Sequence, residues 1–244
     1  MGRPPEHPGS PSDPLGGNSD PGGHPSPGQQ FNIGAAISWA WHKFNKNTTA
    51  LVVPTLVYLV AFGLIGALLL SRLSPQAAGF GRLPLTGIGV FFLVIVPAGV
   101  VMQAAFLSGC LDIADGKPVT IRSFFHPHHF GRVAPSALLV IVLASIGNII
   151  CGFPGLIFSF FALFTIAFAT DRALPPIEAL EASIATVKSN TRGALLSWLV
   201  QILVLTVGAL LCGVGMLVAF PVATLVQTYT CRRLSGGPIA PLTE

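Results

Sequence analysis

Four uncharged polar side chains lie inside long apolar stretches of this sequence: Gln103, Asn148, Gln201 and Gln227. A carboxamide that faces lipid leaves its donors and acceptors unpaired, so we expect all four to face the interior of a helix bundle. There they would either hold helices together, worth about 0.6 kcal/mol on average, or line a ligand path. We favour packing, because uncharged polar residues in membranes are usually packing devices.

Two of these residues occupy matching places in the chain. Gln103 follows Pro97 by six residues, and Gln227 follows Pro221 by six. We therefore predict that Gln103 and Gln227 face one another, and that they bond each other or a backbone carbonyl freed by one of the two prolines.

The other candidates for chemistry have ordinary explanations. His126-Pro127-His128-His129 is the densest histidine cluster, but the proline interrupts it and no Cys or carboxylate is adjacent, so we interpret it as interfacial rather than metal-binding. Glu178 and Glu181 form a spacing suited to a solvated helix face. No nucleophile elbow, zincin motif or P-loop is present. We therefore assign no catalytic, cofactor-binding or metal-binding residue and expect a non-enzyme without a cofactor.

The composition points to lipid as the solvent. The chain has 244 residues, of which 52% are hydrophobic and 9% are charged, whereas soluble domains carry about 25% charged residues. Two stretches, 133–170 and 193–231, hold no charged side chain at all. Each is too long for one membrane span, which takes about 20 residues, and about right for two.

The sequence predicts an all-α membrane protein with six transmembrane helices. Three units repeat one design, a surface helix followed by a hairpin of two spans, and together they fill residues 31–234. The spans are expected near 50–71, 86–111, 133–150, 155–170, 194–211 and 216–230. Interfacial helices are expected near 31–46, 120–130 and 175–190, with Trp39 and Trp41 at the headgroup level.

The two ends of the chain are predicted to be tails. Residues 1–30 contain eight Pro and seven Gly, with almost nothing apolar to bury, so we expect a disordered segment. It would be either a docking arm for a cytoplasmic protein partner or a solvated tail without a specific role. Residues 235–244 form a short C-terminal tail.

Positive charges set the expected orientation. With the N-terminus inside, 11 of the 13 Lys and Arg residues fall in inner segments. The positive-inside rule then places both termini and the interfacial helices on the cytoplasmic side of the cell (inner) membrane. The positive residues flank the membrane instead of clustering away from it, so the lipid bilayer is the expected partner and a nucleic acid is not.

Two motifs carry a resemblance. Residues 31–44 read F-x-I-G-x-A-I-S-W-A-W-x-K-F, and residues 209–223 read A-L-L-C-G-V-G-M-L-V-A-F-P-V-A. With the Pro/Gly-rich start, the chain resembles the actinobacterial, especially mycobacterial, proline and glycine rich transmembrane proteins over essentially its whole length. The resemblance implies an uncharacterised six-span membrane protein and brings no activity or catalytic residue with it.

The sequence thus supports three classes of function, which we rank from the most to the least favoured. The first is a non-enzymatic envelope or scaffold role in the membrane. The second is a transporter of a small molecule or lipid, which would use a cleft between the repeats. A membrane-embedded enzyme ranks last, because no polar acid/base cluster is found within the spans.

Overall fold

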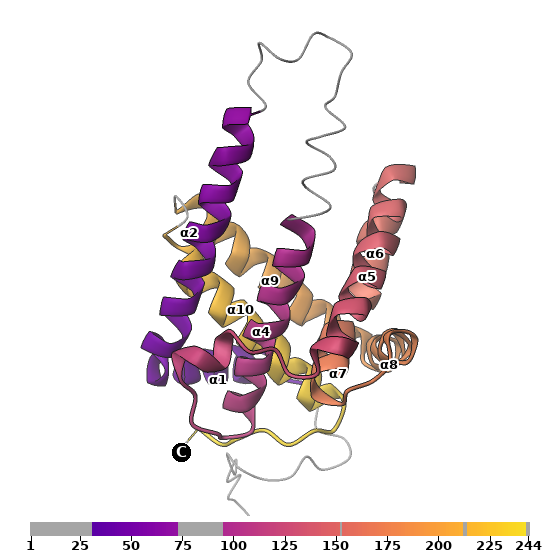
Figure 1. Cartoon of the computed structure of the whole chain (residues 1–244). Helices are drawn as coiled ribbons and strands as arrows, with labels where there is room; N and C mark the ends of the chain where they lie inside the picture. The colour runs from indigo at the N-terminus through magenta and orange to yellow at the C-terminus, as the bar shows by residue number, and fades with distance from the viewer. Residues whose placement is uncertain (1–30, 73–94, 152, 212–213, 243–244) are drawn as a thin grey trace, which may run out of the picture.

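The computed structural model describes residues 31–72, 95–151, 153–211 and 214–242. The predicted disordered tail, residues 1–30, lies outside this part, as does the connection 73–94 (Figure 1). The described residues form helices and no strand. Their order is α1 (Ile33–Lys46), α2 (Thr48–Arg72), α4 (Val96–Ala114), the 3-10 turn η2 (Ile121–Phe124), α5 (Phe130–Cys151), α6 (Phe153–Phe161), α7 (Thr165–Asp171), α8 (Pro176–Ser189), α9 (Thr191–Leu210) and α10 (Met216–Leu234).

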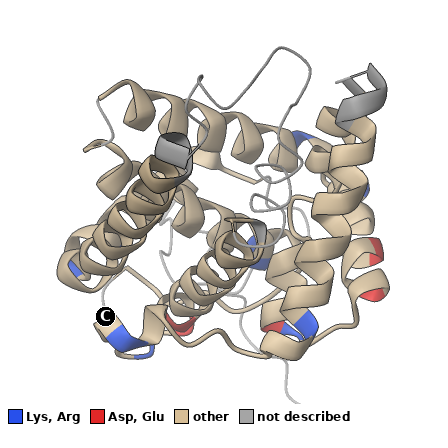
Figure 2. Ribbon diagram, turned by 45° about the horizontal axis from the view of Figure 1, so that its top comes forward, with Lys and Arg blue, Asp and Glu red and all other residues tan. Residues whose placement is uncertain are grey.

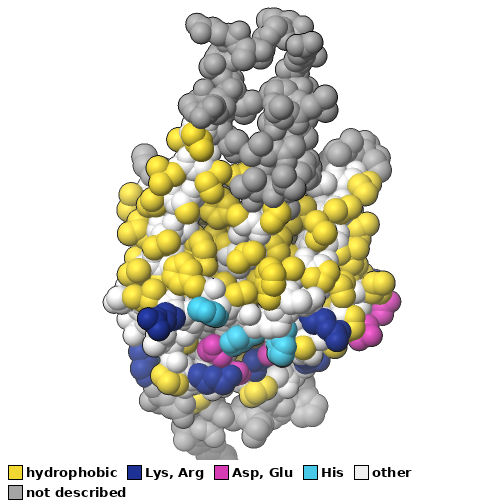
Figure 3. Space-filling model, viewed as in Figure 1, with side chains coloured by type: hydrophobic (Ala, Val, Ile, Leu, Met, Phe, Trp, Pro, Cys, Tyr) yellow, Lys and Arg dark blue, Asp and Glu magenta, His cyan; other side chains and the backbone are white. Residues whose placement is uncertain are grey.

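Five stretches within the described residues are long and apolar enough to cross a membrane: Thr48–Leu68, Pro97–Ala114, Phe130–Gly147, Pro154–Asp171 and Thr191–Leu210. Large apolar side chains on these helices are exposed, and they form a broad band in Figure 3. Among the described residues, the charged side chains lie near helix ends, in connections and on the outer face of α8, as Figure 2 shows. Such a distribution fits a multi-pass membrane protein, because exposed apolar area of this extent is stable only against lipid.

Helix α4 stands at the centre of the packing. One of its faces places Phe106, Cys110 and Ile113 in a core with α1, α2, η2 and α10. The opposite face places Leu107 and Leu111 in a second core with α5, α7, α8 and α9. The helix therefore joins the two halves of the bundle into one packed body.

Helix α1 lies across one end of the bundle. Asn32 caps its start by accepting hydrogen bonds from the amides of Gly34 and Ala35. Trp41 is exposed, as expected for a headgroup-level residue, but Trp39 is buried and its indole Nε1 donates to the Ala240 carbonyl at 2.9 Å. The Trp39 ring packs against Tyr229 of α10, so it faces the bundle, and its level relative to the headgroups stays a prediction.

The two later surface elements differ in size. Helix α8 covers α7 and buries Ala179, Ser183 and Val187, with Pro176 at its first position. Near 120–130 the described structure has only the four-residue turn η2, held by reciprocal hydrogen bonds between Thr120 and Ser123.

The two hairpins after η2 are closed by glycines. A Cβ added to Gly147 of α5 would lie 2.8 Å from the backbone of Gly155 in α6. A Cβ added to Gly215 would lie 2.6 Å from the Gly208 carbonyl oxygen, where α9 meets α10. Small residues allow this approach of two backbones, so each hairpin packs more closely than larger side chains would permit.

Residues 235–242 run back along the bundle instead of leaving it. The Ala240 amide donates to the Ala114 carbonyl at 2.7 Å, and the Lys43 ammonium donates to the Pro241 carbonyl at 2.8 Å. Together with the bond from Trp39, these contacts fasten the described part of the predicted tail to α1 and α4.

Candidate functional site

A cavity of about 330 Å³ lies between α4, α5, α6, α7, α9 and α10. Its wall is mostly apolar, and none of its lining residues carries a charge. The polar lining residues come from α4, α6, α9 and α10: Gln103, Ser159, Trp198, Gln201, Thr224 and Gln227. The volume falls at the lower end of the range of ligand pockets, roughly 300–1,000 Å³.

One wall of the cavity is a broken helix. The span expected near 155–170 is not one continuous helix, because the apolar stretch Pro154–Asp171 forms α6 and α7 with a turn at residues 162–164 between them. The turn contains neither Pro nor Gly, and Ala162 and Leu163 line the cavity. Backbone groups freed inside a membrane must find other partners, since no bulk water is available to them.

A serine from α8 supplies two of these partners. The Ser183 hydroxyl donates to the Phe161 carbonyl at 2.8 Å and accepts from the Phe164 amide at 3.0 Å. Ser183 has no exposed surface. One side chain thus bridges the last residue of α6 and the last residue of the turn.

A glutamine from α10 supplies the third partner. Gln227 Nε2 donates to the Leu163 carbonyl at 2.6 Å. The break is therefore held open by polar side chains inserted from neighbouring helices, which is one of the recognised causes of helix interruption.

The structure brings three of the four predicted interior residues to this cavity. Gln201 is buried on α9, Gln227 is partly buried on α10, and Gln103 is exposed while lining the cavity from α4. The side chain of Asn148 lies outside the described part. The bonding prediction differs from the structure, because Gln227 bonds to a carbonyl freed by the helix break and not by Pro97 or Pro221.

The hydrogen-bond donors of the lining residues are largely used within the protein. Gln201 Nε2 donates to the Ser197 carbonyl at 3.2 Å and to its hydroxyl at 3.1 Å. The Ser159 hydroxyl donates to Gly155, and the Thr224 hydroxyl donates to Phe220. Their oxygens keep lone pairs, so this part of the wall presents hydrogen-bond acceptors.

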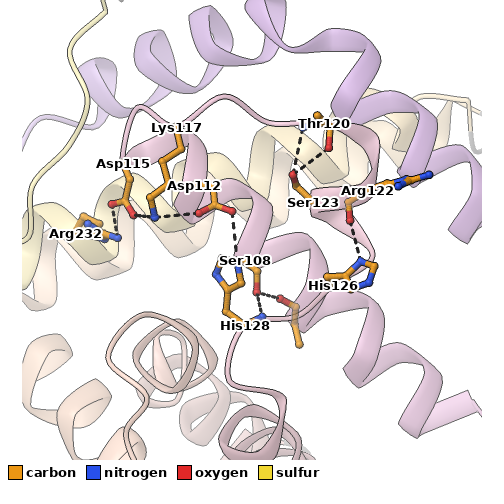
Figure 4. A network of polar contacts seen from close by, with 11 residues as sticks. Ser108, Asp112, Asp115, Lys117, Thr120, Arg122, Ser123, His126, His128 and Arg232 are labelled. Carbon is orange, nitrogen blue, oxygen red and sulfur yellow. Dashed lines mark hydrogen bonds and ion pairs between the residues drawn. The ribbon is translucent and has the colours of Figure 1, made fainter.

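A second polar cluster lies at the charged end of the bundle, drawn in Figure 4. Arg232 of α10 is nearly buried and pairs with Asp115 at 2.8 Å and Asp171 at 2.7 Å. These contacts join the ends of α4, α7 and α10. Lys117 lies beside Asp112 and Asp115, and hydrogen bonds to these carboxylates, that to Asp115 first, raise the pKa of its ammonium.

The histidines of the predicted interfacial cluster point to different partners. His128 Nε2 lies 3.6 Å from an Asp112 carboxylate oxygen, and the His128 amide donates to the Ser108 hydroxyl at 2.9 Å (Figure 4). His126 Nδ1 lies 3.3 Å from the Arg122 carbonyl. Within the described residues no group of three or more His, Cys, Asp or Glu side chains is arranged to hold a metal ion.

The two predicted surface acids belong to a different region. Glu178 and Glu181 are exposed on α8 and border a surface groove of about 610 Å³ together with Pro135 and Leu139 of α5. They lie on the outside of the helix whose opposite face carries Ser183.

Sequence reasoning did not identify Ser159, Ser183 or Thr224. Serine and threonine are common in membrane helices, where the hydroxyl bonds to the carbonyl four residues earlier. Ser159 and Thr224 do this, and Ser183 reaches another helix instead. Of these three residues only Ser183 departs from the ordinary pattern. Its partners, Phe161 and Phe164, are not its neighbours in sequence.

Comparison with known proteins finds relatives of full length. The chain is 39% identical to the uncharacterized protein Mb2590 of Mycobacterium bovis (strain ATCC BAA-935 / AF2122/97), over an alignment of 306 positions, gaps included, that covers 98% of this chain and 94% of the relative. The same identity and coverage hold for the uncharacterized protein Rv2560 of Mycobacterium tuberculosis (strain ATCC 25618 / H37Rv). No protein-family model matches the chain. No solved structure matches it either.

Proposed function

We propose a transport function for this chain, which belongs to the family of the uncharacterized mycobacterial proteins Mb2590 and Rv2560. In this proposal the protein takes a small molecule into the cavity between α4, α5, α9 and α10 and passes it across or out of the bilayer. The names of the relatives state no activity, so the proposal depends on the geometry of the chain itself.

The observation that carries it is the broken helix at an uncharged cavity. Non-helical backbone within a membrane is tolerated where it is buried in protein or lines a cavity, and transporters place their substrate sites at such discontinuous helices. Here the turn between α6 and α7 lines the cavity, and side chains of α8 and α10 stabilise it. A break used only for packing would not need a cavity beside it.

We also propose the finer architecture predicted from the sequence. In it, α10 is a sixth span, although its two final arginines and lower hydropathy leave it outside the five stretches above. The similar glycine closures of α5–α6 and α9–α10 support repeated units. We further propose that both termini are cytoplasmic, that α1, η2 and α8 lie at the inner leaflet, and that the family is the one called proline and glycine rich transmembrane proteins.

Cysteine accessibility tests the transport proposal. Ser159→Cys, in a background whose four native cysteines are replaced by alanine, places a thiol in the cavity wall. A transporter that alternates between two open states should let a small charged methanethiosulfonate reach this thiol in intact cells and in inside-out vesicles. Ser136→Cys is the control, because Ser136 is fully buried and does not line the cavity.

The opposite result would favour the first class expected from the sequence. If Ser159→Cys reacts from neither side, the cavity is not part of a path and a transport function is refuted. The envelope or scaffold role stays a prediction, since its proposed docking arm, residues 1–30, lies outside the described residues.

A further inference from the structure

The cavity wall has polar side chains but no charged one, and this limits the class of molecule that it can bind. Its lining holds carboxamides and hydroxyls but no charged side chain. A charged head group would therefore leave water without a charge to pair with, whereas an uncharged head group would lose only hydrogen bonds that the wall replaces.

On the side of the cavity formed by Ser159, Gln201, Thr224 and Gln227 the polar atoms on offer are mainly acceptors, whereas Gln103 and Trp198 add N–H groups to the wall. Both Nε2 bonds of Gln201 are made to Ser197, and Gln227 Nε2 bonds to the Leu163 carbonyl. The hydroxyl protons of Ser159 and Thr224 point to their own helices. The oxygens of these four side chains still have lone pairs, so at this side of the cavity a ligand that donates hydrogen bonds is matched better than one that only accepts them.

The size of the cavity limits the ligand as well. One water molecule takes about 30 Å³ of liquid volume, so 330 Å³ holds roughly ten groups of that size. Apolar residues from α4, α5, α9 and α10 make up the rest of the wall, and they suit a short hydrocarbon body.

We propose that the cavity binds a small uncharged amphipathic alcohol, with its hydroxyls at the Gln201, Thr224 and Gln227 oxygens and its hydrocarbon against the apolar wall. This inference rests on the proposed function, since it names the kind of molecule that would be carried.

The test is photolabelling of the full chain in membrane vesicles. The probe is a medium-chain 1,2-alkanediol with a diazirine in its hydrocarbon part, and labelled peptides are located by mass spectrometry. The competitors share an eight-carbon chain and differ in the head group: 1,2-octanediol, methyl octanoate, octanoate and octylammonium, each compared at equal concentration in the membrane. Labelling is also compared in sodium chloride and in choline chloride, which tests whether sodium ion occupies the cavity.

The expected result has two parts. Label should appear on cavity segments such as Ala162–Leu163 and Trp198, and 1,2-octanediol should compete at least about tenfold better than the ester or either ion. Thr224→Val should weaken the labelling roughly three- to tenfold. Thr55→Val is its matched control, because each threonine is nearly buried and donates to the carbonyl four residues earlier, but Thr55 does not line the cavity.

The other outcomes show whether the alcohol class fails alone or whether the proposed transport function fails with it. If the cavity is labelled but all four competitors act alike, the alcohol class is refuted while a binding cavity stands. If octylammonium or sodium ion competes best, the acceptors serve a cation and the inference is wrong. If no cavity peptide is labelled, both fail. If Thr224→Val does not fold, Gln201→Leu is measured in its place. It should weaken the labelling to a similar degree.

Discussion

Removing the hydroxyl of Ser183 should destabilise the protein far more than removing any ordinary buried serine hydroxyl. In Ser183→Ala the Phe161 carbonyl and the Phe164 amide both lose the partner that the structure gives them. The site has no solvent exposure, so water does not replace the lost bonds without a rearrangement. Each buried group left unpaired costs about 1–3 kcal/mol.

The magnitude follows from counting these two groups. Their sum would be about 2–6 kcal/mol, but single hydrogen bonds in membrane proteins measure about 0.6 kcal/mol on average and about 1.7 at most. Partial closure of the turn at residues 162–164 would also restore one helical bond. We therefore expect a loss of about 2–3 kcal/mol in the free energy of unfolding, near the lower end of the sum.

Ser136→Ala provides a matched control on α5. Ser136 is as buried as Ser183, but its hydroxyl only adds to the Arg132 carbonyl, at 2.7 Å within the same helix. Its removal orphans no backbone group and should cost less than about 1 kcal/mol. Both variants are measured by unfolding in mixed micelles with increasing dodecyl sulfate. Equal losses for the two variants would refute the bridging role of Ser183.

Three further predictions concern other parts of the molecule. Arg232→Met removes the cation that bridges Asp171 and Asp115 and leaves Asp115 with Lys117 alone, and it should cost about 2–3 kcal/mol by the same unfolding assay; the exposed Arg122→Met should cost little, and a similar loss for both would contradict a structural ion pair. Gly109→Ala drives a methyl into the Phe124 ring and should cost about 1–3 kcal/mol, whereas Gly63→Ala meets no atom and should not destabilise. For topology, Ser12→Cys should react with an impermeant maleimide only after lysis and Gly79→Cys already in intact cells, and labelling of Ser12→Cys from outside would reverse the proposed orientation.

The ends of the apolar helices were accessible to sequence reasoning because charged and capping residues mark them. Span 194–211 was expected where α9 runs from Thr191 to Leu210, and the surface helix near 31–46 appears as α1. Arg192 marks the start of α9 and two glycines, at 213 and 215, follow its end, while Asn32 caps α1, so these limits are visible in the sequence itself. The same reasoning assigned Gln103, Asn148, Gln201 and Gln227 to the interior. Of the three whose side chains are described, Gln201 is buried and Gln227 is partly buried, whereas Gln103 is exposed.

The fastening of the chain end was not accessible in this way. Residues 235–242 have little hydropathy and several turn-forming residues, so they were interpreted as a tail. Their binding depends on Trp39 and Lys43, which lie about 200 positions earlier, at separations of 201 and 198 residues. A local pattern reports what a segment favours alone and not which distant donors meet its carbonyls.

The helix break is the clearest case of the same limit, and it is also the feature on which the proposed function depends. Residues 162–164 read Ala-Leu-Phe, and each of them is compatible with a continuous helix. The helix is interrupted because Ser183, 19 residues from Phe164, and Gln227, 64 residues from Leu163, take over its hydrogen bonds. Inside a membrane a freed carbonyl is tolerated only with such partners, so the break can exist only where α8 and α10 pack against it. The site is therefore a property of the assembled bundle: an uncharged apolar segment becomes a cavity wall through two polar side chains that the sequence places on other helices.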